Sequence, residues 1–511
     1  MSIELTVGNF GSSEIFYDNA AEQGIDCDIS LPDYCPDVVR ILKCSLQNSI
    51  TDSKISGDRA TADGNAKIRI IYSDEHNGIY CYEQDYPFSK YAELPSPFDN
   101  AVLDTRIKTD YVNCRAVSKR RIDVHGVVSI RFKVSGKKND SFVSDACGDG
   151  IQLKRKGFDV ADTVACEMKI FQLSEVESVG EHKPGVGKIL NVCAAPVLSE
   201  SKLIKGKILI KGELAVKVLY CSDEGENEAC EADFSLPFNE IIESENVTDE
   251  CTPDASVCVR QITAEQKTDN EGEFRYININ AELAACVTAC RQKSIRVITD
   301  AYSTETEIDA QYKQTDFVFP GKCVRDDFML RESLDLSSLS PQKLFAVIAE
   351  KPECKCSFTA DKMKITGKIP VGLIVNDSQG MPIFCEREAN IDYSCPVESV
   401  SDGSFCEPRV EMTGYSCTLG GDGKADFKAE LNIAATVMST RRERVITSLK
   451  ADETADKKKR NPSLTVYFCS GSESVWDIAR QYNTTVEDIM QENNLKADYL
   501  ENKTMLLIPI K

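Results

Sequence analysis

The sequence predicts a mainly β protein, in which three β-sandwich-like repeat domains are followed by a small βααβ domain. Three observations predict this fold class. Corresponding residues recur at a spacing of 148, long segments alternate polar and apolar residues, and the end of the chain has a different, partly helical pattern. Alternation with period two is typical of half-buried strands, so we expect the repeats to be built of sheets.

The composition is that of a globular protein with an acidic surface. The 511 residues are 42% hydrophobic and 28% charged, and their formal net charge is −22. The electrostatic field of so negative a chain repels phosphate backbones and anionic lipid, so we expect no nucleic-acid partner and no direct membrane insertion. No apolar run approaches the roughly 18 residues of a membrane span. The N-terminus lacks the cationic leader and apolar core of a signal peptide, which predicts a cytoplasmic protein.

Shared spacings define three copies of one repeat. The first two copies share a proline, a glycine and a tyrosine, each separated by 148 residues: Pro36 and Pro184, Gly64 and Gly212, Tyr72 and Tyr220. A third copy is indicated by Val297-Ile298-Thr299, which recurs at the same spacing as Val445-Ile446-Thr447. The predicted order is therefore an N-terminal segment, three repeats, a linker and a terminal domain, with the bounds 1–25, 26–150, 174–305, 316–452, 453–463 and 464–511.

Within each copy the pattern predicts short strands joined by polar turns. Residues 207–218 alternate polar and apolar side chains over most of their length, and residues 275–290 and 425–438 do the same. Turn signals such as Asp223-Glu224-Gly225 lie between such segments. This arrangement favours one sandwich or barrel per copy, and we expect each copy to bury its own apolar face with few contacts to the others.

The cysteines do not have the spacing of metal ligands. There are 22 of them, yet no C-x-x-C occurs, and the nearest pairs are Cys354 with Cys356 and Cys286 with Cys290. On a strand each of these pairs points to one face, so core packing explains them and no metal site is predicted. An alternative stays open, in which exposed thiols oxidise late into cross-links.

The histidines and the motif content argue against an enzyme. His76, His125 and His182 are the only histidines, and none has a Ser, a Cys or a second His at motif spacing. A phosphate loop, a G-x-S-x-G elbow and an H-E-x-x-H motif are all missing from the sequence. We therefore predict a non-enzymatic protein with no catalytic residues and no cofactor.

The last segment predicts a strand, two helices and a strand. Residues 464–469 are strand-like, and Ser474 caps a helix that carries apolar residues at the spacing of an amphipathic helix. Thr484-Thr485 starts a second helix, Asn493-Asn494 ends it, and residues 505–509 form the closing strand. The order β-α-α-β follows.

At these residues the chain resembles a LysM domain. Ser474-Val475-Trp476-Asp477-Ile478-Ala479, Asn493 and the closing Leu506-Leu507-Ile508-Pro509 follow the family pattern. Where the family has Gly-Asp beside the glycan groove, this chain has Ser472-Glu473, which implies weak or absent glycan affinity. The resemblance implies a site for a protein partner or a glycan, formed by Ser472, Glu473, Ser474, Trp476, Met490, Asn493, Asn494 and Leu495. Trp476, Met490 and Leu495 would form its apolar rim.

The upstream copies resemble the SPOCS repeat of sporulation and coat-associated proteins from spore-forming Firmicutes. Pro184 with Ile189-Leu190, and the strand from Gly212 to Tyr220, carry the likeness best. Three such repeats before a LysM domain are similar to the clostridial coat-morphogenesis family. That resemblance implies an adaptor in the mother-cell cytoplasm, at the forespore surface or spore coat. Its partners would be the stage IV sporulation coat ATPase and other coat proteins. The alternative is a peptidoglycan-binding protein that acts through the LysM domain.

Overall fold

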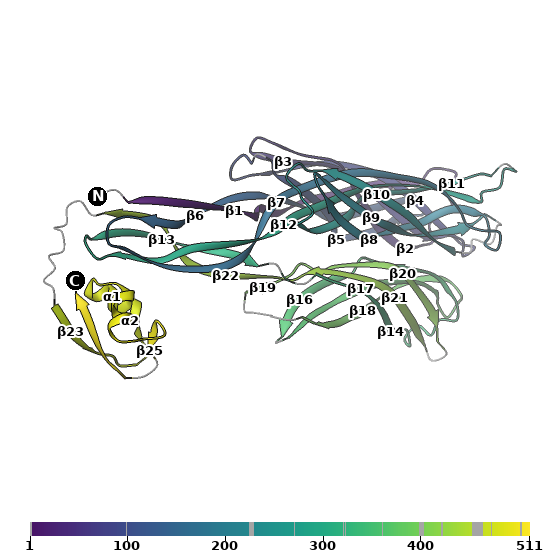
Figure 1. Cartoon of the computed structure of the whole chain (residues 1–511). Coiled ribbons are helices and arrows are strands. Elements are labelled where there is room, and N and C mark those ends of the chain that lie inside the picture. The colour runs from purple at the N-terminus through teal and green to yellow at the C-terminus, as the bar shows by residue number, and fades with distance from the viewer. Residues whose placement is uncertain are drawn as a thin grey trace.

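The computed structural model describes residues 3–510, except for 99, 224–228, 270, 320, 322, 360, 398–402, 421–422, 452–462, 472 and 501–502. Strands dominate the described chain, and its two short helices both lie near the C-terminal end. The mainly β class predicted from the sequence is confirmed. Figure 1 shows a broad head of packed sheets, a narrow stalk that extends from it, and a small domain beside the end of the stalk.

The first sandwich consists of two antiparallel three-stranded sheets, β1-β6-β5 and β2-β3-β4. Its strands are β1 (Glu4–Ser30), β2 (Arg40–Ser56), β3 (Arg59–Ser73), β4 (Ile79–Glu93), β5 (Val102–Ser118) and β6 (Arg121–Cys147). Alternate residues of β3 and β6 face inward and are fully buried, including Ile68, Ile70, Val128 and Ile130. The period-two pattern therefore places one side of each sheet in the core.

The second sandwich repeats this topology with sheets β11-β12-β7 and β10-β9-β8. Its strands are β7 (Ile151–Ser178), β8 (Val186–Ile204), β9 (Lys207–Ser222), β10 (Ala229–Glu243), β11 (Thr252–Lys267) and β12 (Tyr276–Ser303).

The residues that recur at a spacing of 148 hold the same place in both sandwiches. The Tyr72 hydroxyl donates to the carbonyl of Pro36 at 3.3 Å, and that of Tyr220 to the carbonyl of Pro184 at 3.2 Å. A side chain at Gly212 would collide with the Val197 carbonyl and the Phe238 ring, and Gly64 is enclosed in the same way. The repeated proline and tyrosine therefore form the same hydrogen bond in both sandwiches, and the repeated glycine allows the same close approach of the backbone.

The third sandwich has the same layout with interrupted strands. The long first strand is divided into β13 and β14, the second into β15 and β16, and the last into β21 and β22. The bounds are β13 (Ile308–Phe319), β14 (Cys323–Asp335), β15 (Leu344–Ala349), β16 (Glu353–Thr359), β17 (Lys362–Asn376), β18 (Pro382–Pro396), β19 (Ser404–Phe405), β20 (Arg409–Leu419), β21 (Lys424–Thr436) and β22 (Met438–Ala451).

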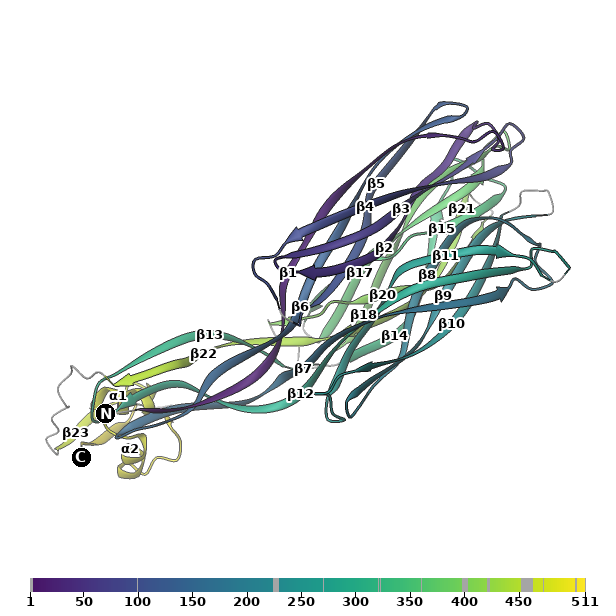
Figure 2. The same ribbon diagram turned by 90° about the horizontal axis from the view of Figure 1, so that it is seen from above.

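The stalk is formed by the first and last strands of all three copies, which run on beyond their sandwiches as two-stranded ribbons (Figures 1 and 2). It comprises residues 4–15 with 135–147, 151–162 with 291–303, and 308–319 with 439–451. Each copy contributes a phenylalanine to its core: the Phe317 ring lies 5.4 Å from Phe10 and 4.8 Å from Phe158. Residues 4–25, expected as a separate N-terminal segment, are thus part of β1.

The three sandwiches also share an apolar cluster in the head, which we call the axial cluster. Each copy supplies three buried residues to it: Leu42, Ile71 and Ile79; Leu190, Leu219 and Cys221; Ala346, Ile348 and Ile374. The expectation that the copies share few contacts is therefore wrong. An equal spacing along the chain indicates that the copies share one fold, but it does not indicate how they pack against each other.

Candidate functional site

The terminal domain has the predicted β-α-α-β order, with a small second sheet added. Strands β23 (Ser463–Phe468) and β26 (Met505–Ile510) pair antiparallel, as do β24 (Glu473–Ser474) and β25 (Tyr499–Leu500). Helices α1 (Val475–Tyr482) and α2 (Val486–Glu492) cover one face of the larger sheet. The core beneath them contains Val475, Ile478, Ala479, Ile489, Leu506 and Ile508. The domain therefore buries an apolar core of its own.

The expected caps begin both helices. The Ser474 hydroxyl accepts from the backbone N–H of Trp476 at 3.2 Å, and the Thr485 hydroxyl accepts from that of Asp488 at 3.0 Å. Each bond satisfies one of the unpaired N–H groups of a first turn. Ser474, one of the candidate site residues, is thus used to start α1.

Asn493 joins the end of α2 to the closing strand. Its side-chain amide donates to the carbonyls of Ile489 at 2.8 Å and Leu507 at 2.7 Å, and its oxygen accepts from the Leu507 N–H at 2.7 Å. An amide that makes three such bonds holds two elements in register. The structure therefore gives this candidate residue an internal position, with its amide turned into the domain.

Glu473 is likewise bonded within its own loop. Its carboxylate accepts from the Tyr467 hydroxyl and from the Ser470 N–H, each at 3.0 Å. Hydrogen bonds from Cys469, Ser470 and Tyr467 to this carboxylate hold the pKa of Glu473 below its ordinary value. Ser472, its neighbour among the candidate residues, lies outside the described residues.

The remaining candidates on this side lie at the end of α2. Met490 and Leu495 are half-buried against the core, and the Leu495 N–H donates to the Met490 carbonyl at 2.9 Å. Asn494 is exposed and adopts a left-handed backbone with φ of 52°, a conformation that Asn tolerates better than most residues. We call Glu473, which lies just before α1, together with Met490, Asn494 and Leu495, which lie around the end of α2, the loop side of the domain. Trp476 lies within α1.

Trp476 faces the stalk. Its indole N–H donates to Asp300 at 2.8 Å, its ring meets Tyr302 edge-on at 4.9 Å, and only 7% of the residue is exposed. Arg480 pairs with Asp300 at 3.0 Å, and the buried Tyr302 hydroxyl donates to the Thr484 carbonyl at 2.7 Å. We call this contact of Asp300, Tyr302, Trp476 and Arg480 the clasp. Trp476, which the sequence suggested for the rim of the partner-binding site, is therefore buried in a contact within the chain.

An apolar face lies on the other side of the domain. In the register of β23 and β26, Leu464 opposes Pro509, Val466 opposes Leu507, and Phe468 opposes Met505, so all six side chains share the sheet face that the helices do not cover. We call these six residues the apolar face. Its exposed fractions reach 56% at Leu464, 48% at Val466, 76% at Phe468 and 57% at Met505.

The sequence analysis used these residues only as a strand pair and did not include them among the site residues. The signal that could have found them is the run of apolar residues at alternate positions of both strands, Leu464, Val466 and Phe468 in β23 and Met505, Leu507 and Pro509 in β26. A strand with one solvent face normally has polar residues there.

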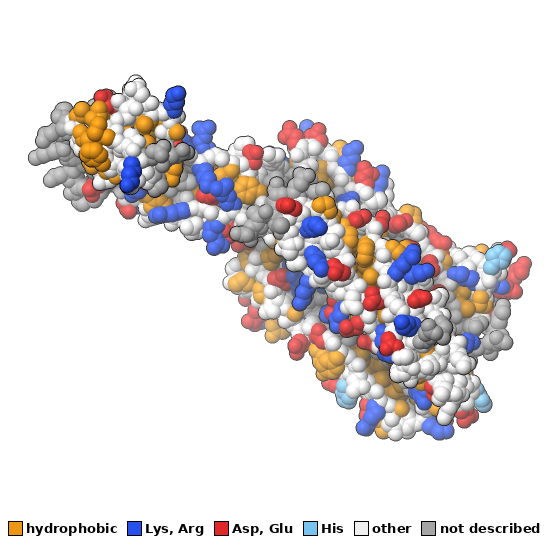
Figure 3. Space-filling view, turned by 90° about the horizontal axis from the view of Figure 1, so that it is seen from below, with side chains coloured by type: hydrophobic (Ala, Val, Ile, Leu, Met, Phe, Trp, Pro, Cys, Tyr) orange, Lys and Arg blue, Asp and Glu red, His pale blue; other side chains and the backbone are white. Residues whose placement is uncertain are grey.

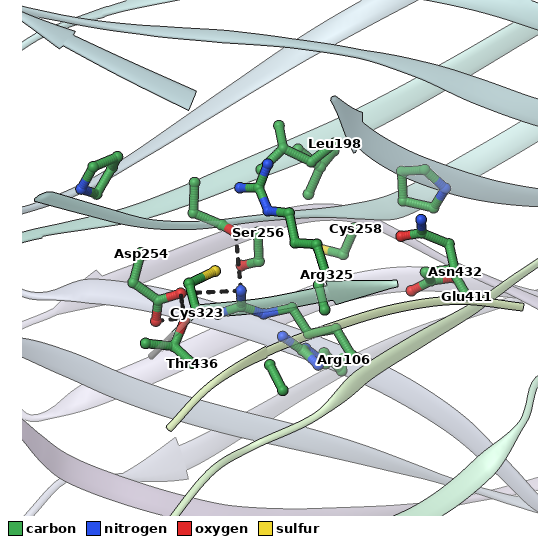
Figure 4. A pocket seen from close by; sticks show the side chains of 17 residues that line it. Arg106, Leu198, Asp254, Ser256, Cys258, Cys323, Arg325, Glu411, Asn432 and Thr436 are labelled. Atoms are coloured by element: carbon green, nitrogen blue, oxygen red, sulfur yellow. Dashed lines mark hydrogen bonds and ion pairs between the residues drawn. The ribbon is translucent and has the colours of Figure 1, made fainter. Parts of the chain in front are cut away.

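A second candidate is a polar cavity where the three sandwiches meet (Figure 4). Arg106 comes from the first copy, Asp254 from the second, and Arg409 and Glu411 from the third. Arg409 pairs with Asp254 at 3.1 Å and also donates to the Ala255 carbonyl. Burial raises the pKa of Glu411. The Arg409 guanidinium and the Asp254 carboxylate neutralise each other, and their ion pair joins the third copy to the second.

In the described part of the chain, no helix is long and apolar enough to cross a membrane. Among the same residues, no three His, Cys, Asp or Glu side chains gather as metal ligands would.

Comparison with family models matches two stretches of the body and the terminal domain. Residues 37–117 and 185–267 match the model described as SipL, SPOCS domain, and residues 472–509 match the LysM domain. The two SPOCS matches fall in the first and second sandwiches, and the third sandwich has their strand order. No match was found among curated proteins or among solved structures.

The fold and these matches define a class: a modular protein of β repeats and a terminal LysM domain, both from families of non-catalytic binding domains. More particularly, the order of two matched SPOCS domains before a C-terminal LysM domain matches that of a SipL-type protein. These domains support a role related to the spore coat or to peptidoglycan binding.

Proposed function

We propose that this chain is a non-enzymatic adaptor in endospore coat and cortex assembly. It works in the mother-cell cytoplasm at the forespore surface, where its LysM domain docks onto the stage IV sporulation coat ATPase. The observation that carries this proposal is the apolar face, which leaves Leu464, Val466, Phe468 and Met505 about half or more exposed. Hydrophobic side chains gather on this domain at the left end of the molecule in Figure 3.

The chemistry of this face suits a protein better than a sugar. Its six side chains offer no hydrogen-bonding group, whereas a glycan chain presents hydroxyls and amides that need partners when they are buried. Contiguous exposed apolar residues on a protein surface commonly mark a protein-binding site. The face also lies opposite the helices, so a partner reaches it without opening the clasp.

Peptidoglycan binding through the loop side of the domain is the competing function. The LysM match favours it, and Glu473, Asn494 and Leu495 would be its contacts. In this chain, however, the Glu473 carboxylate is already bonded to Tyr467 and Ser470. A sugar that used this carboxylate would have to displace both bonds, and this cost supports the protein partner over the glycan.

The test uses the full chain and measures capture of the purified coat ATPase beside sedimentation with purified peptidoglycan. Val466→Glu with Phe468→Glu places two charges on the apolar face, and we expect it to weaken ATPase capture about tenfold or more. Tyr499→Glu is the matched control, because Tyr499 is 52% exposed and lies on β25, away from the face. It should leave capture unchanged.

The reverse pattern would overturn the proposal. If the double variant captured the ATPase as well as the native chain did, the apolar face would not be the docking surface. If, in addition, the native chain pelleted with peptidoglycan and Asn494→Ala abolished pelleting, the glycan function would take its place.

A further inference from the structure

A hollow lined with cationic side chains lies where the LysM domain meets the stalk. Its lining residues come from five elements, and we call them the basic hollow: Lys154, Thr299, Asp300, Tyr312, Arg444 and Arg480. The three cations belong to β7, β22 and α1, so the stalk and the terminal domain both contribute. In Figure 3, Lys and Arg side chains gather on the stalk beside the terminal domain.

The single carboxylate of the hollow already has its partners. Asp300 accepts from the Trp476 indole at 2.8 Å and from the Tyr312 hydroxyl at 2.9 Å, and it pairs with Arg480 at 3.0 Å. The Ala301 N–H also donates to Asp300, at 2.9 Å, so four donors fill the accepting positions of this carboxylate. Asp300 is therefore held as part of the clasp and is not open to a further cation.

The other two cations have no such compensation. Within the described residues, neither Lys154 nor Arg444 forms an ion pair, and the Arg444 guanidinium instead stacks 3.7 Å above the Tyr312 ring. Stacking fixes the plane of the guanidinium and leaves its N–H edge free. With Arg480 balanced by Asp300, the hollow keeps two positive charges in a chain whose net charge is −22.

We infer that the basic hollow is a binding site for a phosphate group. Arginine forks and a lysine ammonium are the groups that proteins use for phosphate, and two uncompensated charges match a phosphate dianion. This site is distinct from the apolar face and from the loop side of the LysM domain, so it goes beyond the docking function proposed above. Because the stalk supplies Lys154 and Arg444 while the terminal domain supplies Arg480, a bound phosphate strengthens the clasp.

Trp476 provides a direct readout, because it is the only tryptophan of the chain and it donates to Asp300 in the hollow. The full chain is titrated with inorganic phosphate at constant ionic strength, and binding is followed by calorimetry and by Trp476 fluorescence. We expect one saturable site. Lys154→Gln with Arg444→Gln should weaken it about tenfold or more, since each lost bond to a charged group is worth at least that factor.

Lys205→Gln with Lys207→Gln is the matched control, because it removes the same charge from exposed positions in the second sandwich. The control should bind phosphate like the native chain. An equal loss of phosphate affinity in both double variants would overturn the proposed site. So would a calorimetric or fluorescence signal that chloride reproduces. Vesicles then assign the source: displacement of phosphate by phosphatidylglycerol but not by phosphatidylcholine identifies a lipid headgroup, and no displacement by either identifies a free phosphate compound.

Discussion

The three sandwiches and the LysM domain meet their neighbours in different ways. The sandwiches share buried apolar residues, in the axial cluster of the head and again along the stalk around Phe10, Phe158 and Phe317. The LysM domain has its own core, to which the stalk adds one buried residue, Tyr302, and it otherwise meets the stalk through polar bonds around Asp300. The body is therefore built as one cooperative unit, whereas the terminal domain is a module held by a clasp.

The largest effect is expected from the axial cluster. Leu219→Ala removes a side chain that is 3% exposed and packs with residues of all three copies, so it should cost about 2–5 kcal/mol. Calorimetry should show the whole body unfolding in one transition at a lower temperature. Ile204→Ala, at a 49% exposed position of the same sandwich, should change little. Separate melting of the second sandwich would show that the copies are independent.

A smaller effect is expected at the clasp. Asp300→Ala leaves the Trp476 indole and the Tyr312 hydroxyl without their acceptor and should cost about 1–3 kcal/mol of docking. Trp476 fluorescence should shift to the red and become more accessible to acrylamide, while the melting temperature of the sandwiches stays the same. Asp309→Ala, at an exposed position on the stalk, is the control. An unchanged Trp476 signal in Asp300→Ala would contradict the clasp.

The smallest effect concerns the pH response of the LysM domain. The folded domain lowers the pKa of Glu473 from 4.5 through bonds from Cys469, Ser470 and Tyr467. A lowered folded pKa means stability that is present above pH 4.5 and lost as the pH falls through the folded value. The melting temperature of the domain should therefore fall on acidification below this pH, and less steeply in Glu473→Gln. A parallel fall in both proteins would exclude this carboxylate as the cause.

The sequence was sufficient for features that repeat or that lie close together along the chain. Gly212 and Tyr220 could be predicted as structural because their counterparts recur at one spacing, and Ser474 could be predicted as a cap because capping is local. The helix order of the LysM domain followed from the same local signals. These predictions needed no knowledge of how distant segments pack.

The rest depends on contacts between distant segments. Trp476 and Asp300 are 176 residues apart, and nothing in the pattern around either residue indicates the other. The phenylalanines of the stalk look like ordinary strand residues until three ribbons come together. The apolar face could not be located from the pattern alone, because the alternation in β23 does not tell which of the two sides of the strand is buried.

Hydrogen exchange of the full chain, with and without the coat ATPase, tests the central claim most directly. If the apolar face docks the partner while the clasp keeps the module in place, residues 463–468 and 505–510 should gain protection. Amides at residues 298–302 and 476–480 should keep the protection they have in the free chain. Protection gained at the loop side around Glu473 and Asn494, or lost at the clasp with none gained on β23 and β26, would contradict this account.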